Sequence, residues 1–204
     1  MIYVLAGVNG AGKSSIGGSA LHAASQYWYN PDAVAREMQI RYPDRPMEEI
    51  HGIVWNEGLR RLKTAILKDA NFAFETTLGG ETITHTLLDA IAAGVQVHVW
   101  YCGLSTPELH IQRVAARVAR GGHDIPETII RSRCKTSLTH LRRLVPGLCR
   151  LAVYDNSQPL NDHGAPGIRL LLHMIQGKLH MPDADMPDWA KPIAAACLTK
   201  VKSA

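Results

Sequence analysis

Short apolar runs alternate along this chain with segments in which apolar residues recur every three or four positions. Short apolar runs predict buried strands, whereas the wider spacing predicts amphipathic helices. The predicted strands are 2–6, 72–77, 95–102 and 151–154. The predicted helices are about 13–25, 33–42, 47–69, 80–93, 106–120 and 187–201, with a further one whose N-cap is Asp124, followed three positions later by Glu127.

The order of these elements predicts the fold class. Strands that alternate with helices imply βαβ units, with right-handed crossovers and a parallel sheet. The run 95–102 is almost continuously apolar, which favours a parallel strand covered on both faces. We therefore expect an α/β three-layer sandwich, with a mostly parallel sheet and helices on both faces. Beyond Asn156 the pattern weakens, and 168–174 and 178–181 are predicted to form a small hairpin.

Length and composition fit one globular domain. The chain has 204 residues, of which 46% are apolar, and this is enough to bury one sizeable core. Its 17 glycines and 11 prolines fall far short of the content of low-complexity chains. We expect a single domain over 1–204, with a core of about 1–157 and a C-terminal extension of about 158–204.

Charge and hydropathy narrow the range of partners. The formal net charge of +4 suits an anionic ligand but lacks the clustered basic stripe of a nucleic-acid binder. No stretch approaches the ~18 apolar residues that a membrane span needs, and the N-terminus carries no signal-peptide pattern. The 4 cysteines are widely spaced, as is typical of reduced thiols. We therefore expect a soluble, cytoplasmic protein with no nucleic-acid and no membrane partner.

One motif carries specific chemistry. The segment from Gly7 to Ser14 matches the phosphate-loop pattern G-x-x-x-x-G-K-[ST], between a predicted strand and a predicted helix. Glycines allow the positive φ angles that point backbone N–H groups at phosphate oxygens, and the next helix adds its positive N-terminal dipole. Lys13 would reach the β- and γ-phosphates, and the Ser14 hydroxyl would bind Mg²⁺. The predicted nucleotide-binding residues are Gly7, Val8, Asn9, Gly10, Ala11, Gly12, Lys13, Ser14 and Ser15.

The phosphate loop is shared by several reaction classes. A transporter ATPase would need Asp-Glu after a strand, but Asp155 is followed by Asn156, and the required Ser-Gly-Gly signature is missing from the sequence. A GTPase would need an Asn-Lys-x-Asp motif, which the sequence also lacks. Two classes of protein remain: a small-molecule kinase, and a nucleotide-binding regulator or ATPase. A kinase further needs a base, groups that hold the acceptor, and cations near the transferring phosphoryl group.

Two acidic positions are candidates for these roles. Asp32 follows a predicted helix and a short extended segment, and it could be a general base or merely the N-cap of the next helix. Glu75 and Thr77 end the run 72–77, at the edge where open α/β sheets bind ligands. They could hold acceptor hydroxyls. Glu75 could instead act indirectly on Mg²⁺, or both residues could only terminate a strand.

Arginines recur on one face of the predicted helix 106–120. Arg113, Arg117 and Arg120 follow three- and four-residue steps, and the helix ends at two glycines. Glycine hinges beside an arginine row are typical of a lid over the transferring phosphate, but a solvated basic face gives the same spacing. His123 lies in this segment as a lid residue or as an ordinary loop residue.

Taken in this order, the motifs resemble those of the zeta toxin family of P-loop kinases, especially its bacterial chromosomal branch, whose members are often loosely called ABC-type ATPases. The resemblance extends from Ile2 to Ser157. The segments that carry it are Leu5-Ala-Gly-Val-Asn-Gly-Ala-Gly-Lys-Ser-Ser15, Asn30-Pro-Asp32, Phe72-Ala-Phe-Glu-Thr-Thr-Leu78, Arg117-Val-Ala-Arg-Gly-Gly-His-Asp-Ile-Pro-Glu127 and Val153-Tyr-Asp-Asn-Ser157.

The resemblance implies a kinase that uses ATP and Mg²⁺. Its expected reaction is transfer of the γ-phosphate of ATP to a hydroxyl of a small-molecule acceptor, which in characterised members of the family is the 3′-hydroxyl of UDP-N-acetylglucosamine. Carried over position by position, Lys13 and Ser14 become the contacts to phosphate and Mg²⁺. Asp32 becomes the general base.

The resemblance also assigns the acceptor and lid positions. Glu75 and Thr77 become acceptor-binding residues. Arg117 and Arg120 supply the lid charges, with Arg113 or Arg131 as an alternative for one of them.

One departure from the family pattern concerns a protein partner. The phosphate loop starts at Gly7, which leaves no room for the helix that precedes the first strand in plasmid-borne toxins. That helix takes part in antitoxin docking in the family. The sequence therefore argues against toxicity and against an antitoxin partner.

Overall fold

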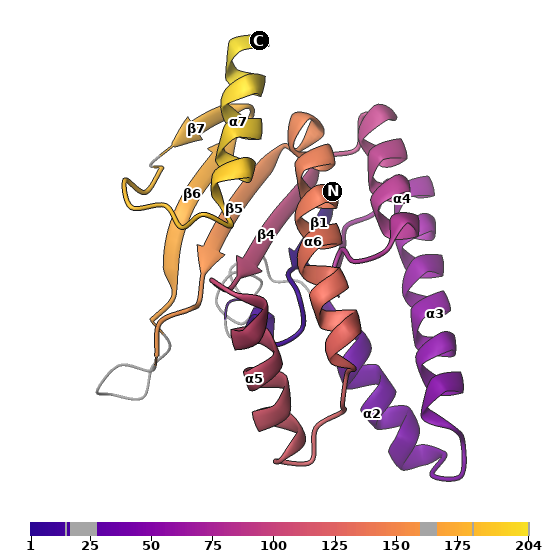
Figure 1. The fold of residues 1–204 in the computed structure, drawn as a ribbon. Coiled ribbons are helices and arrows are strands. Elements are labelled where there is room, and N and C mark those ends of the chain that lie inside the picture. The colour runs from indigo at the N-terminus through magenta and orange to yellow at the C-terminus, as the bar shows by residue number, and fades with distance from the viewer. Residues whose placement is uncertain (15, 17–27, 160–166, 181, 204) are drawn as a thin grey trace.

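A computed structural model describes residues 1–14, 16, 28–159, 167–180 and 182–203. Within these ranges the strands form one sheet in the order β2-β3-β1-β4-β5-β6-β7 (Figure 1). Neighbouring strands from β2 to β5 are parallel, whereas β6 and β7 are antiparallel to their neighbours. The strands are β1 Ile2–Ala6, β2 Trp28–Tyr29, β3 Phe72–Thr76, β4 Val97–Gly103, β5 Arg150–Asp155, β6 Arg169–Ile175 and β7 Lys178–His180.

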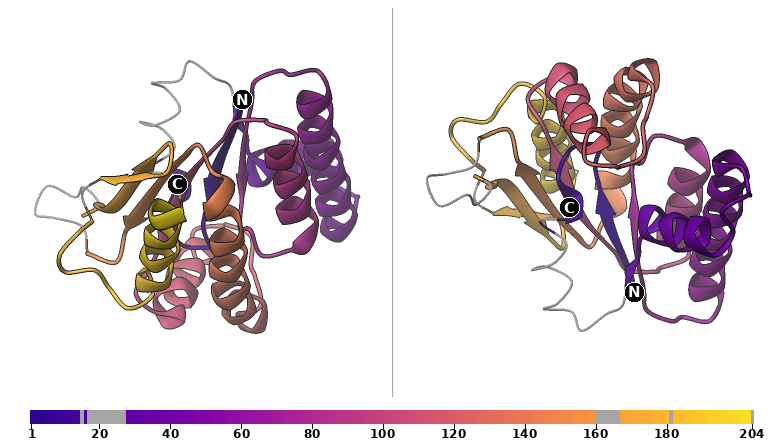
Figure 2. Two further views of the ribbon diagram at one scale, coloured as in Figure 1. Left: turned by 90° about the horizontal axis from the view of Figure 1, so that it is seen from above. Right: turned by 90° about the horizontal axis from the view of Figure 1, so that it is seen from below.

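The helices of the described residues gather largely on one side of the sheet. The main core joins inward-facing residues of β1, such as Val4, to buried residues of α3, α4, α6 and α7. Figure 2 shows the orange α6 and the yellow α7 on the same side of the strands. The helices are α2 Pro31–Arg41, α3 Met47–Leu67, α4 Glu81–Ala92, α5 Pro107–Val118, α6 Glu127–Leu144 and α7 Lys191–Ser203, with a short 3₁₀ turn at Val145–Gly147.

The other face of the sheet is covered where the phosphate loop leaves β1. Lys13, Ser14 and Ile16 are helical, and Ile16 packs with Leu5, Ala73 and Cys102. Consecutive β1 residues are therefore buried on opposite faces, as expected of a central parallel strand. The α/β class with a mostly parallel sheet is confirmed, while 17–25 of the predicted helix 13–25 lies outside the described residues.

Two local expectations change. Residues Trp28–Tyr29, expected only as an extended segment, form a short edge strand because they pair with Ala73 and Phe74 of β3. The predicted N-cap at Asp124 is wrong, because α6 is capped at Pro126. A residue before proline is disfavoured in helical conformation, so the helix begins only after Pro126. The Asp124 carboxylate instead accepts from the N–H of Ile125.

The C-terminal segment completes the sheet and the core. The predicted hairpin is confirmed as β6 and β7, and α7 contributes the fully buried Ile193 and Cys197 to the main core. A Cβ added to Gly103, at the end of β4, would lie 2.4 Å from the ring of Trp189. The segment after Asn156 thus packs directly on the parallel strands.

Two further expectations concern cysteines and membranes. The 4 cysteines, all within the described residues, form no disulfide with one another; Cys102 and Cys197 are buried, and Cys134 and Cys149 are half-buried. In the part of the chain that the structure describes, no helix has the length and hydropathy to cross a membrane.

The single-domain expectation leads to a stability prediction. Ile193→Ala should lower the free energy of unfolding by about 2–5 kcal/mol, because it leaves a cavity in the shared core. Leu198→Ala on the same helix, at a side chain that is 52% exposed, should change it by less than about 0.5 kcal/mol. Thermal and urea unfolding would measure both. Two separate transitions, with only one shifted by Ile193→Ala, would contradict the single domain.

Candidate functional site

The phosphate loop runs from Gly7 to Gly12 between β1 and the helical residues 13 and 14. Gly7, Gly10 and Gly12 have φ angles of +144°, +80° and +84°, as expected from the motif. The space around these glycines is also too small for a side chain. A Cβ on Gly7 would lie 2.2 Å from the Cys102 carbonyl oxygen, and one on Gly12 would lie 2.3 Å from the Asn156 amide nitrogen. Both backbone conformation and close approach therefore require glycine.

Side chains from three surrounding elements fix this loop. The Asn156 amide, just after β5, donates to the Ala11 carbonyl at 2.9 Å, as does the Cys102 thiol at the same distance. The buried His110 of α5 donates from Nδ1 to the Asn9 carbonyl at 2.8 Å. These contacts hold carbonyl groups that would otherwise be buried without a partner. The loop is therefore organised before any ligand arrives.

Burial sets the protonation of two of these groups. It lowers the pKa of His110 to about 4, so the imidazole is neutral at pH 7 and keeps a single N–H for Asn9. Burial also raises the pKa of the Cys102 thiol to about 12, so the thiol stays protonated and can donate. Neither group adds charge to the phosphate site.

A nearly buried ion pair lies beside the loop. Lys13 Nζ is 3.4 Å from Glu75 Oε1, and the two side chains are 9% and 10% exposed. The second carboxylate oxygen of Glu75 accepts from the Asn30 amide at 3.1 Å. Residue Leu5 of β1 pairs with Glu75 in parallel register, which places the end of β3 next to the phosphate loop. The structure thus brings the predicted residues Lys13 and Glu75 together.

Asp32 lies at the start of α2, and the sequence allowed it to be either a general base or the N-cap of this helix. Asn30 is the N-cap, with its side-chain oxygen accepting from the N–H of Ala33, and Asp32 lies in the first helical turn. The capping interpretation of Asp32 is therefore wrong. Its exposed carboxylate lies 3.8 Å from Arg117 Nη1, and Arg117 Nη2 also donates to the carbonyl of His123 at 2.8 Å.

The arginine row separates into different contacts. Arg113 donates to the Asn156 carbonyl at 2.7 Å, beside the phosphate loop. Arg120 is exposed and donates to the Ala116 carbonyl of its own helix. Arg131 pairs with Glu108 at an exposed position. Arg117 is thus brought to Asp32, and the lid roles of Arg117 and Arg120 both stay predictions.

Thr77 begins a segment that α6 holds in place. Its carbonyl accepts from the Ser137 hydroxyl at 2.7 Å, and its own hydroxyl accepts from the N–H of Gly79. Next to it, the buried Leu78 has a φ of +50°, which is unfavourable for a branched side chain.

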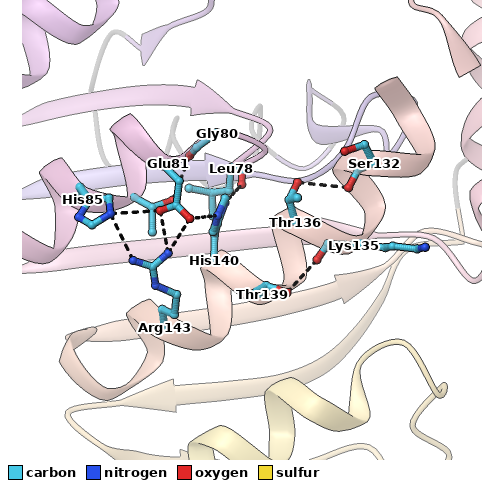
Figure 3. A network of polar contacts seen from close by, with 11 residues as sticks. Leu78, Gly80, Glu81, His85, Ser132, Lys135, Thr136, Thr139, His140 and Arg143 are labelled. Atoms are coloured by element: carbon cyan, nitrogen blue, oxygen red, sulfur yellow. Dashed lines mark hydrogen bonds and ion pairs between the residues drawn. The ribbon is translucent and has the colours of Figure 1, made fainter. Parts of the chain in front are cut away.

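His140 and Arg143, on the next turns of α6, also hold the segment that follows β3. His140 contacts the Leu78 carbonyl at 2.6 Å through Nδ1 and Glu81 at 3.1 Å through Nε2. Arg143 pairs with the same Glu81 carboxylate at 2.7 Å, as Figure 3 shows. The strained turn after β3 is therefore tied to α6 from both ends.

Three residues of the site, Arg133, Asn156 and Asn30, received no role from the sequence, although Asn156 and Asn30 lie in segments that carry the family resemblance. Arg133 of α6 donates to the Asn9 side chain at 2.8 Å, and burial lowers the pKa of its guanidinium. Asn156 and Asn30 contact the loop and Glu75 as described above. A helix-start pattern, Asn before Pro, also marks Asn30, and tertiary packing brings the other two to the loop. Of the predicted loop residues, Ser15 lies outside the described residues.

The pKa of His110 gives a prediction for stability against pH. The folded-state value lies below the ordinary 6.5, so unfolded chains take up a proton first as pH falls, and stability is lost between about pH 6.5 and 4. At pH 5 the loss from this group is roughly 2 kcal/mol. Melting at pH 7 and pH 5 should show a smaller loss for His110→Gln. The exposed His85→Gln is the control, and equal pH dependence in both variants would contradict the assignment.

One sequence relative matches a large part of the chain. No protein-family model matches the sequence. An uncharacterized protein of Haemophilus influenzae (strain ATCC 51907 / DSM 11121 / KW20 / Rd) is 32% identical over 127 residues. The match covers 62% of this chain and 87% of the relative.

Solved structures share the fold. The AvrRxo1-ORF1:AvrRxo1-ORF2 complex with sulphate ions matches with a TM-score of 0.64 at 16% identity, over 91% of this chain and 61% of that chain. A structure of the same complex with ATP matches with a TM-score of 0.63 at 15% identity, over 97% of this chain and 63% of that chain. The chain thus spans less than two thirds of these AvrRxo1-ORF1 structures.

Two further structures match with a TM-score of 0.52 and 13% identity. One is a putative kinase from Chloroflexus aurantiacus J-10-fl, matched over 65% of this chain and 76% of that chain. The other is the PezAT chromosomal toxin-antitoxin system of Streptococcus pneumoniae, matched over 100% and 86%. These likenesses show that the chain shares the α/β fold of these proteins, and by sequence the chain belongs to the family of the Haemophilus influenzae protein.

Proposed function

We propose that this protein is an ATP- and Mg²⁺-dependent phosphotransferase that moves the γ-phosphate of ATP to a hydroxyl of a small metabolite. One observation carries the proposal. Lys13 of the phosphate loop pairs with Glu75, and the Asn30 side chain both donates to Glu75 and caps the helix whose first turn carries Asp32. The kinase-like fold and the ATP complex of a structural neighbour support it.

The loop side of the site holds the triphosphate. The backbone N–H groups of the loop and the side chain of Lys13 bind the phosphate oxygens. The exposed Ser14 hydroxyl, in the first turn after the loop, is the proposed Mg²⁺ ligand. Mg²⁺ commonly takes one or two protein ligands together with phosphates and waters, so it needs no cluster of acidic side chains. When bound, the ion neutralises charge on the phosphates.

The carboxylates serve the acceptor. Asp32 takes the proton of the attacking hydroxyl as the bond from the acceptor oxygen to the γ-phosphorus forms. The bond from that phosphorus to the β–γ bridging oxygen breaks, and ADP leaves. Glu75 and Thr77 hold acceptor hydroxyls through charge-assisted and neutral hydrogen bonds.

Arginines supply positive charge for the transferring phosphoryl group. Arg117 lies at Asp32 and Arg133 at the phosphate loop, and Arg120 would join them on movement of its turn. A nucleotide sugar such as UDP-N-acetylglucosamine is the proposed acceptor, on the resemblance to the zeta toxin family. AvrRxo1-ORF1 was solved in complex with AvrRxo1-ORF2 and PezAT is a toxin-antitoxin system, so a protein partner is compatible with the fold.

The reaction itself is tested with ATP and a panel of hydroxylated metabolites that includes UDP-N-acetylglucosamine. Mass spectrometry should find a phosphorylated acceptor together with ADP. Lys13→Ala should abolish the product and weaken ATP binding, because the γ-phosphate loses its cation. Lys63→Ala, at an exposed position of α3, is the matched control. ADP and free phosphate without any phosphorylated acceptor would indicate the alternative, an ATPase or regulator.

The base is tested with Asp32→Asn, which keeps the shape of the side chain but cannot take a proton. Turnover should fall by about 10²- to 10⁴-fold. ATP affinity and thermal stability should stay close to wild type, because Asn30 caps the helix and an exposed ion pair contributes about 1 kcal/mol or less. Glu37→Gln on the same helix is the control. An Asp32→Asn protein with half of the wild-type turnover would rule out the base assignment.

A further inference from the structure

The cations of the site are already paired with the carboxylates assigned to the acceptor. Lys13 contacts Glu75 at 3.4 Å, and Arg117 contacts Asp32 at 3.8 Å. The first pair is the stronger constraint because both of its side chains are about nine-tenths buried. A buried charge without its partner is strongly destabilising, so neither member can leave unless another charge replaces it.

Bound ATP can replace only the anion of this pair, Glu75, as the partner of Lys13. A phosphate oxygen at Lys13 Nζ would compete with Glu75 Oε1 for the same ammonium group. With both present, two anions would face each other across a short distance in a poorly solvated site. The carboxylate oxygen must therefore turn away from Lys13 as the nucleotide enters.

Asn30 determines where the released carboxylate stays. Its amide nitrogen holds Oε2 of Glu75, and its amide oxygen is fixed by the cap of α2. Glu75 can thus give up the Lys13 contact through Oε1 while it remains anchored through Oε2. The freed oxygen is then available to an acceptor hydroxyl on the same side of the site.

We infer that ATP and the acceptor bind cooperatively, because the nucleotide displaces Glu75 from Lys13 and makes its carboxylate available to the acceptor. This inference rests on the proposed function, since it takes Glu75 as an acceptor-binding group. Asn30 is the positioning residue that keeps Glu75 in place during the exchange. Binding of each ligand then favours the other by the same factor.

The competition is measured with the ATP analogue AMP-PNP and Mg²⁺ by isothermal titration calorimetry. Glu75→Gln removes the competing charge and should tighten AMP-PNP binding about five- to tenfold. Glu75→Ala should shift it in the same direction, and serves if the glutamine variant does not fold. Glu57→Gln removes a carboxylate that Arg60 and Arg61 bind on α3, and should change affinity less than about twofold.

A substitution of Asn30 tests its positioning role, and it should weaken AMP-PNP binding rather than tighten it. Asn30→Ser keeps a capping oxygen but cannot reach Glu75, so the carboxylate depends more on Lys13 and AMP-PNP should bind about two- to fivefold more weakly. In the Glu75→Gln background the same substitution should have no effect on affinity. A purely structural role of Asn30 would weaken binding equally in both backgrounds.

The outcomes separate the two proposals. If wild-type protein binds AMP-PNP and Glu75→Gln leaves the affinity unchanged, the inference is wrong and the kinase proposal stands. Weaker binding by Glu75→Gln also overturns the inference, and places Glu75 with the nucleotide and Mg²⁺. If wild-type protein does not bind AMP-PNP, both proposals fail.

Discussion

The parallel pairing of β1 with β3 and β4 is the constraint on which the rest of the site depends. Leu5 pairs with Glu75 on one side and with Trp100 on the other. Because parallel strands end at the same edge of the sheet, the phosphate loop leaves β1 beside the acidic end of β3 and the Cys102 carbonyl of β4. A slip of one residue between β1 and β3 would turn Glu75 to the opposite face and separate it from Lys13.

Helix α6 joins the two halves of the site. Arg133, Ser137 and His140 follow one another at four- and three-residue steps, so they share one face of the helix. Arg133 contacts the phosphate loop through Asn9, whereas Ser137 and His140 hold the carbonyls of Thr77 and Leu78. The nucleotide and acceptor sides are therefore braced by a single rigid element, which favours a fixed distance between the proposed reacting groups.

Local sequence pattern predicts the central strands, most of the helices and the phosphate loop of the site. Apolar runs and helical spacing predict the central strands and most of the helices, since both reflect burial against one core. The phosphate loop can also be predicted from the sequence, because its three positive-φ glycines and the helix after it are set by neighbouring residues. By contrast, Asp32 and Asp124 both look like N-caps, and neighbouring proline and asparagine decide that neither is one.

The sequence by itself determined the order of the elements, the phosphate loop and the residue types available for the chemistry. Tertiary structure alone decided which of them meet. Arg113, Arg117 and Arg120 are equivalent by spacing, yet one reaches Asn156, one reaches Asp32 and one faces solvent. Spacing places side chains on a face of their own helix, whereas their partners depend on how distant segments pack. No local pattern around Arg133 indicates that it contacts Asn9.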